Sequence, residues 1–188
     1  MKNIFCLAVA AALAFSISSC AYVDQLFAPK RVVELDYLDK TTEIDIKKFF
    51  NGDIEAFAIV QDKDGKIVGT YSNKIHGKWE ENKGVIQYNL VDDKGNKDNR
   101  TWLITLEADN GTFEVVGHDF TKPADGKQIG NAAQMIYALT MRSKEGRIEV
   151  KFDDKMYLVD EKSMILVSSF TKENGDHGKK IVSLRKLN

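Results

Sequence analysis

The side chains best suited to chemistry are ionisable groups within apolar stretches, namely Arg100, Asp119 and the adjacent pair Asp153 and Asp154. Glycoside hydrolysis uses two carboxyl groups that face each other across a cleft at about 5 to 9 Å. Neighbouring residues of a strand point to opposite faces, so Asp153 and Asp154 do not form such a pair with each other. A carboxylate-dependent hydrolase therefore ranks third among the possible functions, behind non-enzymatic ligand binding and an interaction or assembly role.

The sequence lacks the residue patterns that other kinds of catalysis need. The sequence has no G-x-S-x-G motif, and its three histidines, His76, His118 and His177, are scattered without a second ligand at metal spacing. The Asp-rich segments 62–65 and 92–99 lack the glycine and the final glutamate of a calcium loop and are typical of hairpin tips. The sequence therefore predicts no catalytic residues, no metal, no cofactor and no enzymatic activity.

Two charged residues interrupt faces that are otherwise apolar. Arg100 alternates onto the same face as Trp102, and Asp154 interrupts the apolar face of residues 148–158. A charge on such a face must be paired or neutralised, because its desolvation costs several kcal/mol. Arg100 paired with Asp119 or Asp154 could be an internal ion pair that fixes the strand register. It could also be a polar anchor for a ligand, and a bulge at Asp154 would turn that side chain outward.

Aromatic and methionine side chains recur along the alternating faces. They could line a lipid cavity or simply fill a barrel; they are Phe57, Tyr71, Trp102, Met135, Tyr137, Phe152, Met156 and Phe170. The residues expected to contact a ligand are Arg100, Trp102, Asp119, Tyr137, Asp154 and Tyr157.

These side chains must be positioned by strands. From Asp53 onward the sequence alternates with period two, and turn signals arrive after about ten residues each time. The predicted strands are 53–61, 66–75, 85–92, 100–107, 112–118, 132–142, 147–159, 164–172 and 179–187. Short connections exclude crossover helices, and closure removes exposed strand edges. We expect an all-β fold, an antiparallel up-and-down meander of about 8–9 strands that closes into a barrel or half-barrel.

One short helix is expected before the strands. Residues 42–45 approximate a capping box that begins at Thr42, and Ile46, Phe49 and Phe50 follow at helical spacing. The helix should end at Asn51-Gly52.

The N-terminus has the pattern of a targeting segment. Lys2 precedes the uncharged apolar run 4–15, which is long enough for a signal peptide and too short for a membrane span. Residues 17–20, Ile-Ser-Ser-Cys, resemble the bacterial lipobox, in which the cysteine is acylated. The alternative is an ordinary secretory peptide with an incidental Cys20. In lipoprotein sorting of the enteric type, an Asp shortly after the acylated cysteine retains the protein in the inner membrane. Tyr22 stands two places after Cys20 instead, so the resemblance implies the outer membrane.

This interpretation divides the chain into a signal peptide, 1–19, an acylated cysteine with a tether, 20–40, and a barrel domain, 41–188. Acyl chains such as palmitate on Cys20 would anchor the protein to the membrane, because each buried methylene contributes about 0.8 kcal/mol. The 27 Lys and Arg residues nearly balance the 28 Asp and Glu residues. With a net charge of −1 the protein has no positive electrostatic field that would attract the phosphates of a nucleic acid, so no nucleic-acid partner is expected.

Several segments together resemble a known family. They are residues 49–68, the Arg100–Trp102 pair, residues 117–119, residues 130–132 with Tyr137, and residues 152–162. In this order they resemble short Gram-negative outer-membrane lipoproteins described only as a domain of unknown function. A weaker likeness is to lipocalin-type barrels, carried by Gly77-Lys78-Trp79 and the late Arg185, although Gly77 follows two predicted strands instead of opening the barrel.

The leading expectation is an outer-membrane lipoprotein, facing the periplasm, whose lipocalin-like barrel binds a small amphipathic or lipid-like ligand. The alternative is a non-enzymatic envelope interaction or assembly protein built on a solid barrel.

Overall fold

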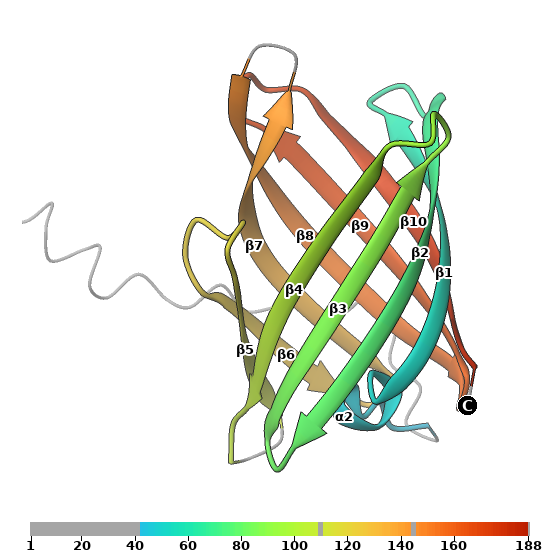
Figure 1. The fold of residues 1–188 in the computed structure, drawn as a ribbon, viewed down its shortest axis with the longest axis vertical. Coiled ribbons are helices and arrows are strands. Elements are labelled where there is room, and N and C mark those ends of the chain that lie inside the picture. The colour runs from blue at the N-terminus through green and yellow to red at the C-terminus, as the bar shows by residue number, and fades with distance from the viewer. Residues whose placement is uncertain (1–41, 109–110, 144–145, 188) are drawn as a thin grey trace, which may run out of the picture. The chain divides into compact units, whose positions relative to one another are not determined.

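The computed structural model describes residues 42–108, 111–143 and 146–187; the predicted signal segment, Cys20 and the tether lie outside them. The described residues form one antiparallel sheet closed into a barrel (Figure 1). Its strands are β1 (Gly52–Asp62), β2 (Ile67–Glu80), β3 (Lys83–Asp92), β4 (Lys97–Leu106), β5 (Thr112–Gly117), β6 (Ala124–Ile129), β7 (Ala132–Ser143), β8 (Gly146–Asp160), β9 (Ser163–Lys172) and β10 (His177–Lys186). Each strand pairs with its neighbours in sequence, and β1 pairs with β10 to close the barrel.

The predicted all-β meander is confirmed, but the barrel has ten strands instead of 8–9. The strand missing from the prediction is β6, which lies between the predicted strands 112–118 and 132–142. Its inward positions carry Ala124, Gly126 and Gln128, so the segment has no apolar alternation. The Phe113 ring of β5 lies over Gly126, where an added Cβ would collide with it. The core volume at β6 is thus filled by a side chain from the neighbouring strand.

The helix α2 (Ile46–Phe49) is shorter than predicted and begins later. Its N-cap is Asp45, whose carboxylate accepts a hydrogen bond of 2.9 Å from the Lys48 amide, and not Thr42. The Ile44 amide donates to the Gly130 carbonyl at 2.7 Å, which ties the chain just before the helix to the connection between β6 and β7. No helix among the described residues combines the length and hydrophobicity needed to cross a bilayer.

Helix α2 covers one end of the barrel, here called the closed end (Figure 1). Ile46 and Phe49 are 1% and 3% exposed, so the helix buries its apolar side against the barrel interior. Lys186 of β10 donates from Nζ to the carbonyls of Lys48 at 3.1 Å and Phe49 at 3.0 Å, and also to that of Asn51. A cation there satisfies the helix's last carbonyls and complements its dipole.

Strand β2 extends five residues beyond its predicted end, to Glu80. Gly77 permits this extension, because a Cβ there would collide with the Phe50 carbonyl. Trp79 packs against Gly84 of β3. Arg185 is exposed on the outer face of β10, so the late arginine of the lipocalin likeness does not lie over this indole.

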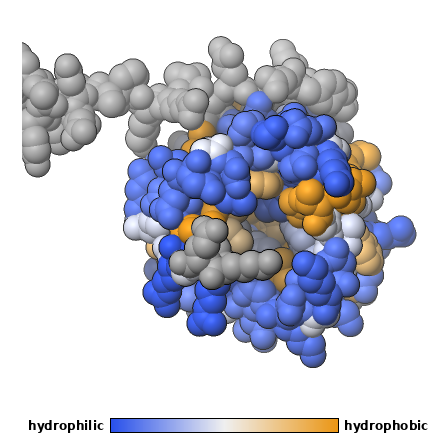
Figure 2. Space-filling view, turned by 90° about the horizontal axis from the view of Figure 1, so that it is seen from above, coloured by the Kyte–Doolittle hydropathy of each residue, from blue (hydrophilic) through white to orange (hydrophobic). Residues whose placement is uncertain are grey.

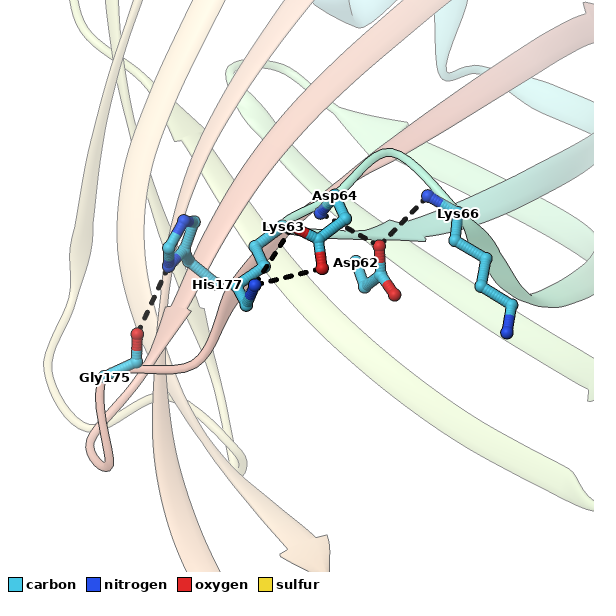
Figure 3. Close-up of polar contacts among 6 residues, drawn as sticks. All are labelled: Asp62, Lys63, Asp64, Lys66, Gly175 and His177. Carbon is cyan, nitrogen blue, oxygen red and sulfur yellow. Dashed lines mark hydrogen bonds and ion pairs between the residues drawn. The ribbon is translucent and has the colours of Figure 1, made fainter.

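The opposite end, here called the open end, is rimmed by hairpin turns. In the β1–β2 turn, Asp62 accepts hydrogen bonds of 3.0 Å from the amides of Asp64 and Lys66 (Figure 3). Asp92 binds the amides of Lys94 and Asn96 in the same way in the β3–β4 turn. Both Asp-rich segments are therefore hairpin tips, as predicted, and the bound Asp92 side chain has a lowered pKa because it accepts hydrogen bonds from Asn96. Viewed from this end, hydrophilic residues ring a hollow in which hydrophobic residues are visible (Figure 2).

Candidate functional site

The barrel interior contains a cavity of about 120 Å³. Its lining extends from Ile46 and Phe50 of the closed end to Tyr71, Leu90 and Arg100 towards the open end. An engineered cavity of roughly 150 Å³ holds one benzene molecule, and pockets for drug-sized ligands begin at about 300 Å³. In this arrangement the space suits one small ring or a short apolar chain and is too small for a whole lipid.

Arg100 lies at the open side of the cavity within two ion pairs. Its guanidinium binds Asp98, with Nε and Nη2 at 2.9 and 2.7 Å from the carboxylate, and lies 3.5 Å from Asp119. The Arg100 side chain is 18% exposed and that of Asp119 is 11% exposed. Of the two carboxylates expected opposite Arg100, the structure brings Asp119 to it and not Asp154.

Asp154 projects into the middle of the cavity from β8. No register shift occurs at this point in its pairing with β7 or β9, so the alternative of a bulge is wrong. Asp154 is 3% exposed, and its Oδ2 accepts a hydrogen bond of 2.9 Å from the Tyr137 hydroxyl. Its Oδ1 has no hydrogen-bond partner among the residues that the structure describes. On the other face of β8, Asp153 accepts a hydrogen bond from Gln134.

Aromatic rings form a continuous wall beside Asp154. Trp102 is 4.8 Å from Tyr88 and 5.7 Å from Tyr137, measured between ring centroids. Tyr137 stacks on Phe152 at 5.0 Å, and Phe152 is 6.3 Å from Phe170. Such contacts add about 0.5–1.5 kcal/mol per pair beyond the area that they bury.

The tyrosine hydroxyls of the interior remain neutral. Burial raises the pKa of Tyr71, Tyr88 and Tyr137, and the negative charge of Asp154 raises each of them further. These hydroxyls therefore serve as hydrogen-bond donors and acceptors at physiological pH.

Four of the six predicted ligand residues line the cavity, and they are Arg100, Trp102, Tyr137 and Asp154. Asp119 contacts Arg100 but is not part of the lining. The prediction that Tyr157 contacts the ligand is wrong. Strand alternation places its side chain on the outer face of β8, away from Asp154 and the cavity. Phe57 is also outside, at 62% exposed, because the inward positions of β1 around it are Ala56 and Ala58.

Three polar residues of the cavity lining were not among the residues singled out from the sequence. Asn73, Tyr88 and Lys180 all line the cavity. Alternation could have found Lys180, since it shares a face of β10 with buried Val182.

Metal binding finds no support among the described residues, where no three His, Cys, Asp or Glu side chains gather in a group that could hold an ion.

The fold and the site together define the class of protein, which is a closed antiparallel β-barrel with a small, partly polar internal cavity. The chain belongs to the family described as "Protein of unknown function (DUF3833)", whose model matches residues 26–186. No curated protein shows significant sequence similarity to it.

Solved structures share the barrel at low sequence identity. An S-type phycobiliprotein lyase from Guillardia theta has a TM-score of 0.58 and 6% identity, over 77% of this chain and 94% of that one. A fluorescence-activating β-barrel designed de novo has a TM-score of 0.41 and 12% identity, over 77% and 99% of the two chains. The first similarity shows a common fold alone.

Proposed function

We propose that this protein binds a small amphipathic molecule inside its barrel and does so without chemical conversion. The observation that supports the proposal is the cavity of about 120 Å³, where an apolar wall meets buried polar atoms that have no hydrogen-bond partner in the described part of the chain. Buried polar atoms are normally hydrogen-bonded, so a cluster that is not points to a binding site. The cavity volume favours a small amphipathic molecule over an intact lipid.

We further propose that the barrel faces the periplasm on an outer-membrane anchor at Cys20. The support is the lipobox-like Ile-Ser-Ser-Cys at 17–20, behind an apolar signal segment. Labelled palmitate should be incorporated into the wild-type chain and not into Cys20→Ala, and the label should fractionate with outer membranes. Label at the inner membrane, or none at all, would contradict the anchor and leave the binding proposal standing.

Native mass spectrometry of protein purified from membranes tests the binding proposal. A retained small adduct that disappears in Trp102→Ala and survives in the outer-face control Tyr157→Phe is the expected result. An apo mass with co-purifying proteins would favour the alternative, an interaction or assembly protein. Activity on periplasmic glycans that is lost in Asp154→Asn would instead favour a hydrolase.

One observation favours the interaction alternative. The outer wall across β9, β10, β1, β2 and β3 carries a shallow groove of about 550 Å³. Phe57, at 62% exposed, and the partly exposed Ile59 and Ile181 contribute to it, and exposed apolar surface often marks a contact with another molecule.

A further inference from the structure

The interior carries a row of three polar side chains on adjacent strands. Asp154 of β8 pairs in register with Ser168 of β9, and Ser168 pairs with Lys180 of β10. All three lie on the inward face, since their strand neighbours at alternate positions line the cavity. Adjacent strands are about 4.8 Å apart, so roughly 10 Å of backbone separates Asp154 from Lys180.

The two ends of this row carry opposite charges that do not meet. The Lys180 ammonium lies 5.1 Å from the centroid of the Phe152 ring and beside the Tyr71 hydroxyl. Among the described residues, no ion pair joins it to Asp154. Lys180 is partly exposed and can remain hydrated, whereas Asp154 is 3% exposed. The uncompensated desolvation therefore falls on the carboxylate.

Three buried polar atoms of the barrel interior can accept further hydrogen bonds. Oδ1 of Asp154, Oγ of Ser168 and Oδ1 of Asn73 are buried and have no hydrogen-bond partner within residues 42–108, 111–143 and 146–187. Ser168 is 0% exposed and Asn73 is 7% exposed. The other cation near the cavity, Arg100, is already bound to two carboxylates.

The walls beside the carboxylate favour positive charge. Tyr137 donates to Asp154 and stacks on Phe152. Ring faces attract cations, and the position of Lys180 over Phe152 shows that this wall already holds an ammonium group.

We infer that the barrel selects a small organic cation, an ammonium group on an apolar or aromatic body, with the ammonium at Asp154 and the body within the aromatic wall. The inference rests on the proposed function and specifies its ligand class. A charge-assisted hydrogen bond to a buried carboxylate is about twice as strong as a neutral one.

Three ligands of nearly equal shape test this inference: benzylammonium, benzyl alcohol and benzoate. Each is titrated by NMR at neutral pH into the full chain purified in dodecyl maltoside. Benzylammonium should bind at least about tenfold more tightly than benzyl alcohol, and benzoate more weakly than both. Asp154→Asn should remove this tenfold preference, whereas Asp125→Asn, which removes the same charge from the exposed face of β6, should retain it.

Equal or tighter binding of benzyl alcohol or benzoate in the wild-type chain would overturn the inference and leave the proposed function intact. Binding of none of the three would count against both. If Asp154→Asn fails to fold, the order of the three affinities in the wild-type chain decides whether the inference holds. Ser168→Ala then serves as a second variant, in which only the affinity for benzylammonium should fall, by a few-fold.

Discussion

The closed end and the open end of the barrel are built from the same alternating strands but differ in what their inward residues contact. At the closed end, Ile46 and Phe49 of α2 and Ile54 of β1 are nearly inaccessible and belong to the hydrophobic core. Towards the open end, Leu90, Arg100 and Phe170 are only half-buried. Burial of apolar area contributes about 25 cal/mol per Å², so the closed end contributes more to stability. The open end retains polar groups and space for a ligand.

The strongest test of this difference compares the same residue type at the two ends. Phe49→Ala removes a ring that is 3% exposed and should lower the free energy of unfolding by about 3–5 kcal/mol. Phe170→Ala, in the half-buried region, should cost less than about half of that. Urea unfolding measures both, and equal losses would show that the two ends contribute alike.

Arg100→Met probes the ion pairs of the open end. Asp119, 11% exposed, would lose its cation, so we expect a loss of about 2 kcal/mol in unfolding free energy. Asp98→Asn should cost less than about 1 kcal/mol, because Asp98 is 54% exposed. Thermal melts measure stability, and ligand titration runs in parallel. Unchanged melting with loss of ligand would make Arg100 a ligand anchor instead of a structural pair.

Alkaline pH should weaken the interior through Tyr88 and Tyr137. Burial raises the pKa of both hydroxyls in the folded protein above the usual tyrosine value of 10.0, so the unfolded chain releases these protons first. The contribution of these two tyrosines to the free energy of unfolding is therefore fully present below pH 10. Above pH 10 it falls by about 1 kcal/mol per tyrosine for each pH unit. Urea midpoints at pH 9 and pH 11 should differ less in Tyr137→Phe than in the wild-type chain, whereas Tyr157→Phe on the outer wall should leave the difference unaltered.

The smallest effect should come from Lys186→Met at the closed end. Loss of its hydrogen bonds to the carbonyls at the end of α2 should lower stability by about 1 kcal/mol. Lys179→Met, an exposed neighbour on β10, is the control and should stay within about 0.5 kcal/mol. Hydrogen exchange of the Phe49 and Phe50 amides locates the effect, and unchanged protection there would contradict a capping role.

Alternation along single strands predicted correctly which residues face inward. Arg100 and Trp102 share the inner face of β4, and Asp154 points inward from β8, as their spacing indicated. Phe57 was less predictable, because both faces of β1 carry apolar residues, and the smaller Ala56 and Ala58 are the ones inside. Strand β6 escaped prediction because its core volume is supplied by Phe113 from the next strand.

By itself, the sequence determined the order of nearly all strands, the hairpin tips and the inward placement of the charged residues, since side-chain direction is a local property of an extended chain. Only the tertiary structure decided that Arg100 meets Asp98 and Asp119, that Asp154 is left with one tyrosine donor, and that a cavity remains between them. These outcomes depend on register between strands and on how side chains from opposite walls fill a closed volume, which no single strand encodes.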